Sequence, residues 1–155
     1  MSETLVTDDV RALIGRDWPP VELEVDRSGV RMWARAVGFD DPVFYDEDVA
    51  RERGFASLPA PPGFVGAPRT RPGDPEPGPP IRGLHPELTR SLNGGTEFEY
   101  LVPIVAGDVL VATTRIVGVE EKEGKVGRML IFRRETTYRR EGRDVAVMRQ
   151  TVINY

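Results

Sequence analysis

The chain contains no cysteine and only one histidine among its 155 residues. These absences exclude a disulfide framework, a cysteine nucleophile, and zinc sites built from cysteines or several histidines. No apolar run approaches the roughly 18 to 20 residues that span a bilayer, and the acidic N-terminus is unlike a signal peptide. We therefore expect a cytoplasmic protein that binds no metal and no membrane.

The chain also lacks a strong excess of one charge, since 21 Lys and Arg stand against 25 Asp and Glu. The arginine pairs at 133–134 and 139–140 share their strands with glutamates, which predicts a sheet face of mixed charge rather than a nucleic-acid surface. We expect no nucleic-acid partner. With 39% hydrophobic residues, a chain of this length is expected to form a single domain over residues 1–155.

The first third predicts short helices around one strand. Residues 7–14 begin with a threonine cap and carry an apolar stripe, which predicts a helix. Residues 21–25 alternate apolar and charged side chains, the period of a half-buried strand. A second helix is expected to follow Asp26 and to end at Gly38, and a third is expected over 46–53.

Residues 59–82 hold 9 of the 14 prolines, so no helix is expected there. The last third is rich in β-branched and aromatic residues with glycine turns between them. Four strands are therefore expected in an antiparallel meander, at residues 96–103, 109–119, 125–140 and 144–155. Helices followed by strands predict an α+β domain with helices on one face of an antiparallel sheet.

Two stretches carry a resemblance to a known family. Residues 38–46 (GFDDPVFYD) and 60–64 (APPGF) resemble the helix-loop-helix of the MaoC-like (R)-specific enoyl-CoA hydratases and hydroxyacyl dehydratases. Residues 93–100 (NGGTEFEY) are similar to the N-terminal-half, FAS1-like dehydratase branch of that family. The resemblance implies a hotdog fold, in which an antiparallel sheet wraps round a central helix. It also implies a dimer that binds acyl-CoA at the subunit interface, with the coenzyme A thioester as substrate and no cofactor.

The family's acid and base are an Asp and a His five positions later, in the pattern Gly-Asp-x-Asn-Pro-x-His-x-Asp. Aligning Pro42 with the pattern's proline places Phe39 at the Asp position and Phe44 at the His position. A phenyl ring can neither accept nor donate the proton. The resemblance therefore implies a chain with no catalytic residues of its own.

The family's carbonyl-binding turn is also altered. Pro62 occupies the glycine position, where it would supply no N–H, although a shift of one residue would place Gly63 there. The proline-rich stretch begins where the central helix should run, so we expect that helix to be shortened or replaced by a loop. The substrate-binding candidates are Pro62, Gly63, Phe64, Asn93, Gly94, Gly95, Arg69 and Arg71.

For two groups of these candidates, the residue types themselves indicate a binding role. Arg69 and Arg71, with Arg82, are candidates for the phosphates of coenzyme A, with solvated loop charge as the alternative. Asn93-Gly94-Gly95 indicates a backbone that passes close to a neighbouring chain or ligand.

His85 is the only imidazole and therefore the weak fallback for acid and base work, paired with Asp40 or Asp46. Ordinary roles are favoured for all three: a loop histidine, a turn aspartate, and a helix cap.

Our leading hypothesis is a non-catalytic subunit that shapes the acyl pocket of a heteromeric 2-enoyl-CoA hydratase. A homologous hotdog partner would supply the Asp and His, so lyase activity is expected only in the complex. The missing helix suits bulky acyl groups, a steroid side chain or a very long chain. The alternatives are a self-sufficient homodimeric hydratase with unusual acid and base residues, and a non-enzymatic acyl-CoA-binding module.

Overall fold

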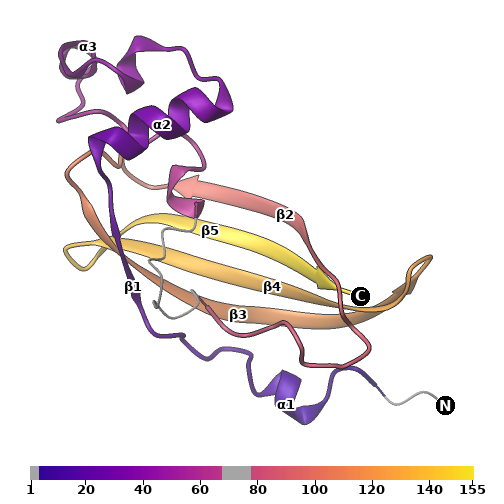
Figure 1. Ribbon diagram of the computed structural model, residues 1–155. Coiled ribbons are helices and arrows are strands. Elements are labelled where there is room, and N and C mark those ends of the chain that lie inside the picture. The colour runs from indigo at the N-terminus through magenta and orange to yellow at the C-terminus, as the bar shows by residue number, and fades with distance from the viewer. Residues whose placement is uncertain (1–3, 68–77) are drawn as a thin grey trace.

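The computed structural model describes residues 4–67 and 78–155, and its centre is a five-stranded antiparallel sheet (Figure 1). The strands are β1 (Val21–Glu24), β2 (Ser91–Tyr100), β3 (Val109–Gly124), β4 (Gly127–Arg140) and β5 (Arg143–Asn154). The helices are α1 (Asp8–Arg11), α2 (Arg27–Val37) and α3 (Glu47–Glu52), with 3₁₀ turns η1 (Pro42–Phe44) and η2 (Phe64–Gly66). The predicted α+β class is confirmed.

The caps of the two longer helices are those that the sequence predicts. The Asp26 carboxylate accepts from the Gly29 N–H at 2.6 Å, and α2 ends at Gly38 in the left-handed region with φ 80°. Asp46 caps α3 in the same way, accepting from the N–H groups of Asp48 and Val49. Both helices were therefore predictable from local signals.

α1 is shorter than the predicted 7–14. Just beyond it, Ile14 forms a bridge with Ile116 of β3, and the Gly15 N–H donates to the Ile116 carbonyl at 2.8 Å. The helix ends here because the backbone of this segment hydrogen-bonds to the edge of β3 instead of continuing the helical pattern.

The strand order is β1-β3-β4-β5-β2, so the predicted meander holds only for β3, β4 and β5. The prediction was wrong for the first strand: β2 runs over 91–100, not 96–103, and it pairs with β5. β1 already occupies the edge of β3, with Val21 opposite Ala112 and Leu23 opposite Leu110. The free edge of β5 remains for β2, and residues 101–108 cross over to β3.

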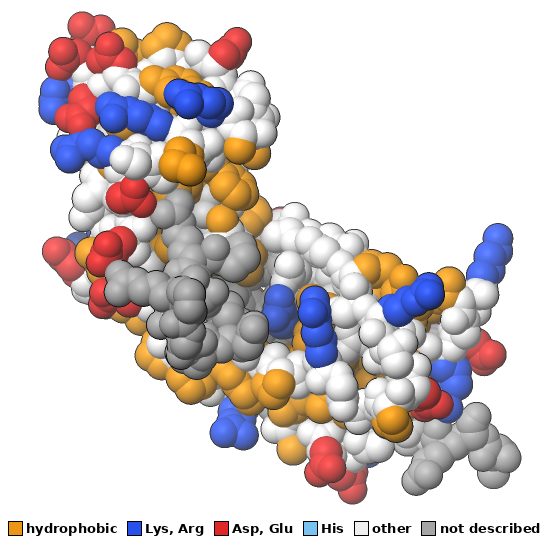
Figure 2. All heavy atoms as spheres, viewed as in Figure 1, with side chains coloured by type: hydrophobic (Ala, Val, Ile, Leu, Met, Phe, Trp, Pro, Cys, Tyr) orange, Lys and Arg blue, Asp and Glu red, His pale blue; other side chains and the backbone are white. Residues whose placement is uncertain are grey.

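α2, η1 and α3 gather at one end of the sheet, which we call the helical end (Figure 1). Acidic and basic side chains are intermixed over α2 and α3, and apolar side chains lie where this end meets the sheet (Figure 2). One apolar cluster, around the buried Phe64 and Leu110, joins the helical end to the sheet. A second, around Leu5 and Phe132, fills the end near α1.

We call the face of the sheet that carries Thr114, Thr136 and Met148 the inner face. In the described part of the chain, the segment that follows Gly63 holds only the three-residue η2, and residues 78–90 form no helix. The prediction that the central helix is shortened or replaced is therefore confirmed for the described residues. Among these residues no helix has the length and apolar character to cross a bilayer.

Candidate functional site

Phe39 and Phe44 lie against each other at the helical end. Their ring centroids are 5.7 Å apart with the planes tilted by 30°. The turn between them is fixed by Asp41, whose carboxylate accepts from the Val43 N–H at 3.0 Å and pairs with Arg53 at 2.8 Å. The Arg53 hydrogen bond lowers the pKa of Asp41, so this carboxylate stays ionised and bound to its partner. Two rings in contact thus occupy the two aligned positions.

Phe44 also lines a cleft of about 430 Å³ between the helical end and the last residues of β2, which we call the Phe44 cleft. Its other walls are almost wholly apolar: Val43, Phe55, Pro59, Ala60, Pro62, Tyr100, Leu101, Val102, Pro103 and Ile104. None of these side chains carries a carboxylate or an imidazole. The cleft can therefore hold an apolar group, but none of its described lining residues has a side chain that titrates near neutral pH.

The turn at Pro62-Gly63 closes one side of the Phe44 cleft. Gly63 has φ 83°, which favours glycine, and its N–H donates to the phenol oxygen of Tyr100 at 2.9 Å. The Pro62 carbonyl accepts from the indole N–H of Trp33 at 3.2 Å, and Phe64 is buried below the turn. Pro62 has no N–H to offer, so the donor in this turn is that of Gly63.

Burial raises the pKa of Tyr100, against the smaller opposing effect of the Gly63 N–H. The phenol is therefore neutral at physiological pH. Neither Tyr100 nor Trp33 was singled out from the sequence. The alternation of Phe98, Tyr100 and Val102 was the available signal, because it places Tyr100 at the end of a strand face.

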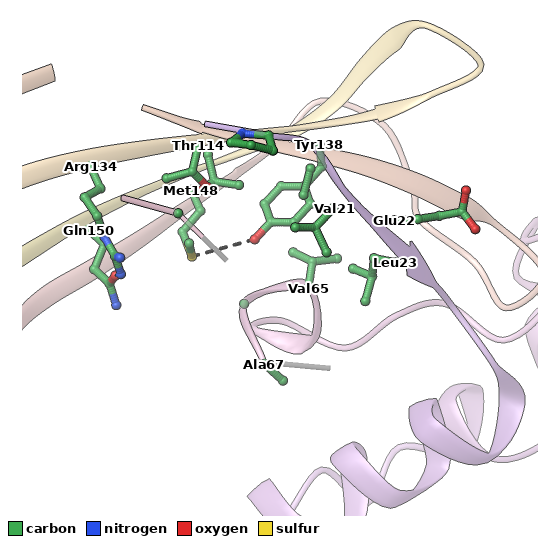
Figure 3. Close-up of a pocket in the computed structure, with 15 residues that line it drawn as sticks. Val21, Glu22, Leu23, Val65, Ala67, Thr114, Arg134, Tyr138, Met148 and Gln150 are labelled. Carbon is green, nitrogen blue, oxygen red and sulfur yellow. Dashed lines mark hydrogen bonds between the residues drawn. The ribbon is translucent and has the colours of Figure 1, made fainter. Parts of the chain in front are cut away.

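A second cleft, of about 290 Å³, lies between η2 and the inner face of the sheet (Figure 3). We call it the inner-face cleft. Its floor holds a Thr114–Thr136 hydroxyl pair at 2.8 Å, and the Tyr138 phenol donates to the Met148 sulfur at 3.9 Å. Burial raises the pKa of Tyr138 strongly, so this phenol also stays neutral. The cleft lies beside the described residues that replace the central helix.

Asn93-Gly94-Gly95 lies at the edge of the sheet in β2. The side-chain oxygen Oδ1 of Asn93 accepts from the Gly95 N–H at 3.0 Å, where the pairing with β5 shifts by one residue. A Cβ added to Gly94 would lie 3.0 to 3.2 Å from side-chain atoms of Ile153 and Thr151. The close approach of Gly94 is therefore to β5 of the same chain, and no described strand pairs with the other edge of β2.

The fallback acid–base residues are not brought together. His85 Nε2 lies 2.7 Å from the Leu5 carbonyl, near the α1 end of the sheet. Asp46 caps α3 at the opposite end, and Asp40 is exposed on the loop after α2 (Figure 1). Arg69 and Arg71 lie outside the described residues. In the part of the chain that the structure describes, no three of the His, Asp and Glu side chains cluster as metal ligands.

The fold places the chain in a class of proteins, those with the hotdog fold of the MaoC-like dehydratases. The fold is similar to a chain of the ChsH1-ChsH2 complex from Mycobacterium tuberculosis, with a TM-score of 0.77 and 16% identity over 96% of this chain and 97% of that one. It is also similar to a chain of the HadBC (3R-hydroxyacyl-ACP dehydratase) complex of the same organism, with a TM-score of 0.71 and 25% identity over 91% and 96%.

The sequence gives the family itself. Residues 12–148 match the FAS1-like, dehydratase domain region. A UPF0336 protein of Streptomyces avermitilis is 34% identical over 115 residues, which are 74% of this chain and 75% of that protein. The chain therefore belongs to the FAS1-like dehydratase domain family, and the resemblance found in the sequence is confirmed.

Proposed function

We propose that this chain is the non-catalytic, pocket-shaping subunit of a heteromeric 2-enoyl-CoA hydratase that acts in the cytoplasm on bulky acyl-CoA. The observation that carries the proposal is the contact of Phe39 with Phe44, 5.7 Å between ring centroids, at the positions aligned with the family's Asp and His. Hydration of an enoyl thioester requires one group to take a proton from water and one to deliver a proton to carbon. Phenyl rings do neither, so a partner would supply both groups.

The partner we propose is a homologous hotdog subunit that carries the complete dyad. Two of the similar structures are complexes of two differently named subunits, ChsH1-ChsH2 and HadBC. On this chain, the unpaired edge of β2 offers backbone donors and acceptors to a further strand. Next to it, Leu101 and Val102 are 50% and 40% exposed and extend the apolar wall of the Phe44 cleft. A partner on this edge would bring its acid and base to the mouth of that cleft.

This chain's own contribution would be to bind and orient the thioester. The Gly63 N–H is a preorganised donor, and a thioester carbonyl that replaces the Tyr100 phenol would receive its hydrogen bond. The rings of Phe39 and Phe44 would keep water away from the acyl group on this side. The reacting water would then be held only by the partner, which places the chemistry on one side of the complex.

The acyl group we propose is bulky, either a steroid side chain or a very long chain. The inner-face cleft lies beside η2, and no helix of the described residues fills the space that the family's central helix would occupy. Losing a helix widens a cavity more than it lengthens a tunnel, so the steroid substrate is the better fit. Coenzyme A enters as part of the substrate, and the proposal needs no cofactor.

The test is co-expression with a dyad-bearing hotdog chain encoded next to this one, followed by purification through a tag on this chain alone. We expect the two chains to co-purify and to hydrate enoyl-CoA, fastest with polycyclic or very long acyl groups. Replacing the partner's Asp or His should abolish turnover, whereas His85→Ala in this chain should leave it unchanged. Acyl-CoA binding with no partner and no turnover would instead identify a binding module.

A further inference from the structure

Arg134 is the one arginine among the described lining residues of the inner-face cleft. It follows Arg133 on β4, and neighbours on a strand point to opposite faces. Arg133 lies on the outer face, where its guanidinium donates to Glu120 at 2.9 Å. Arg134 points from the sheet into the cleft beside Gln150 (Figure 3). The predicted mixed-charge face therefore accounts for Arg133 but not for Arg134.

The Arg134 guanidinium has no carboxylate partner among the described residues. Its Nη2 donates to the Gln150 side-chain oxygen, and its Nε is buried without a hydrogen-bond partner. Among the lining residues that the structure describes, Glu22 is the only carboxylate, and it points away from Arg134 (Figure 3). The side chain is half-buried, and a guanidinium in that position with one neutral partner carries a positive charge that nothing in the described chain balances.

The surroundings increase the demand for an anion. Burial lowers the pKa of Arg134, and the positive charge of Arg82 lowers it further. Arg82 lies shortly after Gly78, where the described chain resumes, and it forms no ion pair with any described carboxylate. Two cations that act on each other, with no acid between them among the described residues, favour a negatively charged ligand.

The rest of the lining is suited to a hydrocarbon. Val21, Leu23, Val65 and Met148 face the same space, and Figure 3 shows them on both sides of it, from β1, η2 and β5. The volume, about 290 Å³, is near the lower end of the roughly 300 to 1,000 Å³ that small ligands occupy. A phosphate-rich ligand would leave these apolar walls unfilled.

We propose that the inner-face cleft binds an apolar chain that ends in a carboxylate, with the carboxylate paired to Arg134. This rests on the proposed function for its biological meaning: the ligand would be an acyl-CoA whose acyl group carries a second, remote carboxylate. The guanidinium would form a two-pronged pair with that group through Nε and an Nη nitrogen. Gln150 accepts a hydrogen bond from Nη2 of Arg134 and so holds the arginine side chain in place, while Nε of Arg134 has no acceptor among the described residues and can donate to the ligand.

The test is calorimetric titration of the full chain, alone or with its co-purifying partner, with octanoate. Methyl octanoate, which has the same chain but no charge, serves as the ligand control. Arg134→Met should weaken octanoate binding roughly ten- to a hundredfold, the range for a charge-assisted bond, and leave methyl octanoate unchanged. The matched control Arg133→Met removes the neighbouring charge on the outer face and should leave both affinities unchanged.

A second variant covers the case in which Arg134→Met fails to fold. Gln150→Glu places a carboxylate beside the guanidinium, so it should raise the melting temperature and abolish octanoate binding. Wild-type affinity for octanoate in Gln150→Glu would overturn the proposal. So would the absence of octanoate binding to the wild-type chain, or equal losses in the Arg133 and Arg134 variants.

Titration with coenzyme A alone distinguishes a site for a carboxylate from a site for a phosphate. If coenzyme A displaces octanoate and its own binding is lost in Arg134→Met, the anion is a phosphate and the proposal is wrong. None of these titrations measures hydration. The absence of hydratase activity therefore would not contradict the Arg134 site, and the absence of octanoate binding would not contradict the proposed subunit role.

Discussion

At the residue scale, the Gly63 N–H is held by the phenol of Tyr100 at 2.9 Å. Tyr100→Phe removes this acceptor and should lower the free energy of unfolding by about 0.5 to 1.5 kcal/mol. In the complex with the proposed partner, the freed N–H should bind a thioester carbonyl roughly two- to tenfold more tightly. Calorimetry with crotonyl-CoA, on a complex whose partner has lost its acid and base, measures the affinity, and denaturant unfolding measures the stability.

Tyr45→Phe is the matched control, because the Tyr45 phenol also bonds to backbone, donating to the Phe39 carbonyl. It should lose stability without any gain in thioester affinity. An equal change of affinity in both variants would show that the Gly63 N–H does not meet the thioester.

At the scale of elements, α3 tests the ordinary role of Asp46 against its fallback catalytic role. Asp46→Ala removes a cap that accepts from two backbone N–H groups and should cost about 0.5 to 2 kcal/mol of unfolding free energy. The hydration rate of the complex should stay at the wild-type value. Asp40→Ala, on the exposed loop, is the control and should change neither quantity. A complex with Asp46→Ala that folds but no longer turns over would assign Asp46 to the chemistry.

The segment before α1 is tied to β3 through Glu121. Its carboxylate accepts from the Leu5 N–H at 2.8 Å and from Arg128, and chiefly the Leu5 hydrogen bond lowers the Glu121 pKa below its ordinary 4.5. A carboxylate with a lowered pKa adds stability that is present above its unfolded value and is lost as the pH falls through its folded value. Glu121→Gln should therefore melt below the wild type at about pH 7, and the difference should shrink toward about pH 3.

Thermal unfolding across that range measures the effect, with Glu123→Gln at the exposed β3 hairpin as the control. A difference between wild type and Glu121→Gln that is constant with pH would contradict the role of the ionised carboxylate.

Local signals predicted the elements well, and non-local pairing explains what they missed. Asp26, Gly38 and Asp46 marked helix ends because caps act within one turn. The position of β2 beside β5 depends on β1 having taken the edge of β3, which no local pattern records. At the site, the aligned Phe39 and Phe44 were found from sequence, but Arg134 was grouped with Arg133. The alternation of a strand would have separated them.

At the scale of the whole molecule, the apolar end of β2 is the surface that we propose to meet the partner. Leu101→Glu places a charge on a half-exposed side chain beside the Phe44 cleft. It should weaken the complex at least about tenfold, because a buried interface would have to desolvate the carboxylate. Val126→Glu, at the tip of the β3–β4 hairpin where Val126 is 63% exposed, should leave the complex intact.

Titration of one subunit with the other measures both affinities, and circular dichroism checks that the variants fold. If Leu101→Glu and the wild type bind the partner with equal affinity, the interface does not include this end of β2.

The division of labour between two subunits is the central claim, and it is tested most directly by the initial rate of crotonyl-CoA hydration by the purified chain alone. Two phenyl rings cannot transfer protons, so the rate should not exceed that of buffer, whereas the same chain with its dyad-bearing partner should turn over. Robust hydration by the isolated chain, lost in His85→Ala, would contradict the claim and assign the chemistry to this polypeptide.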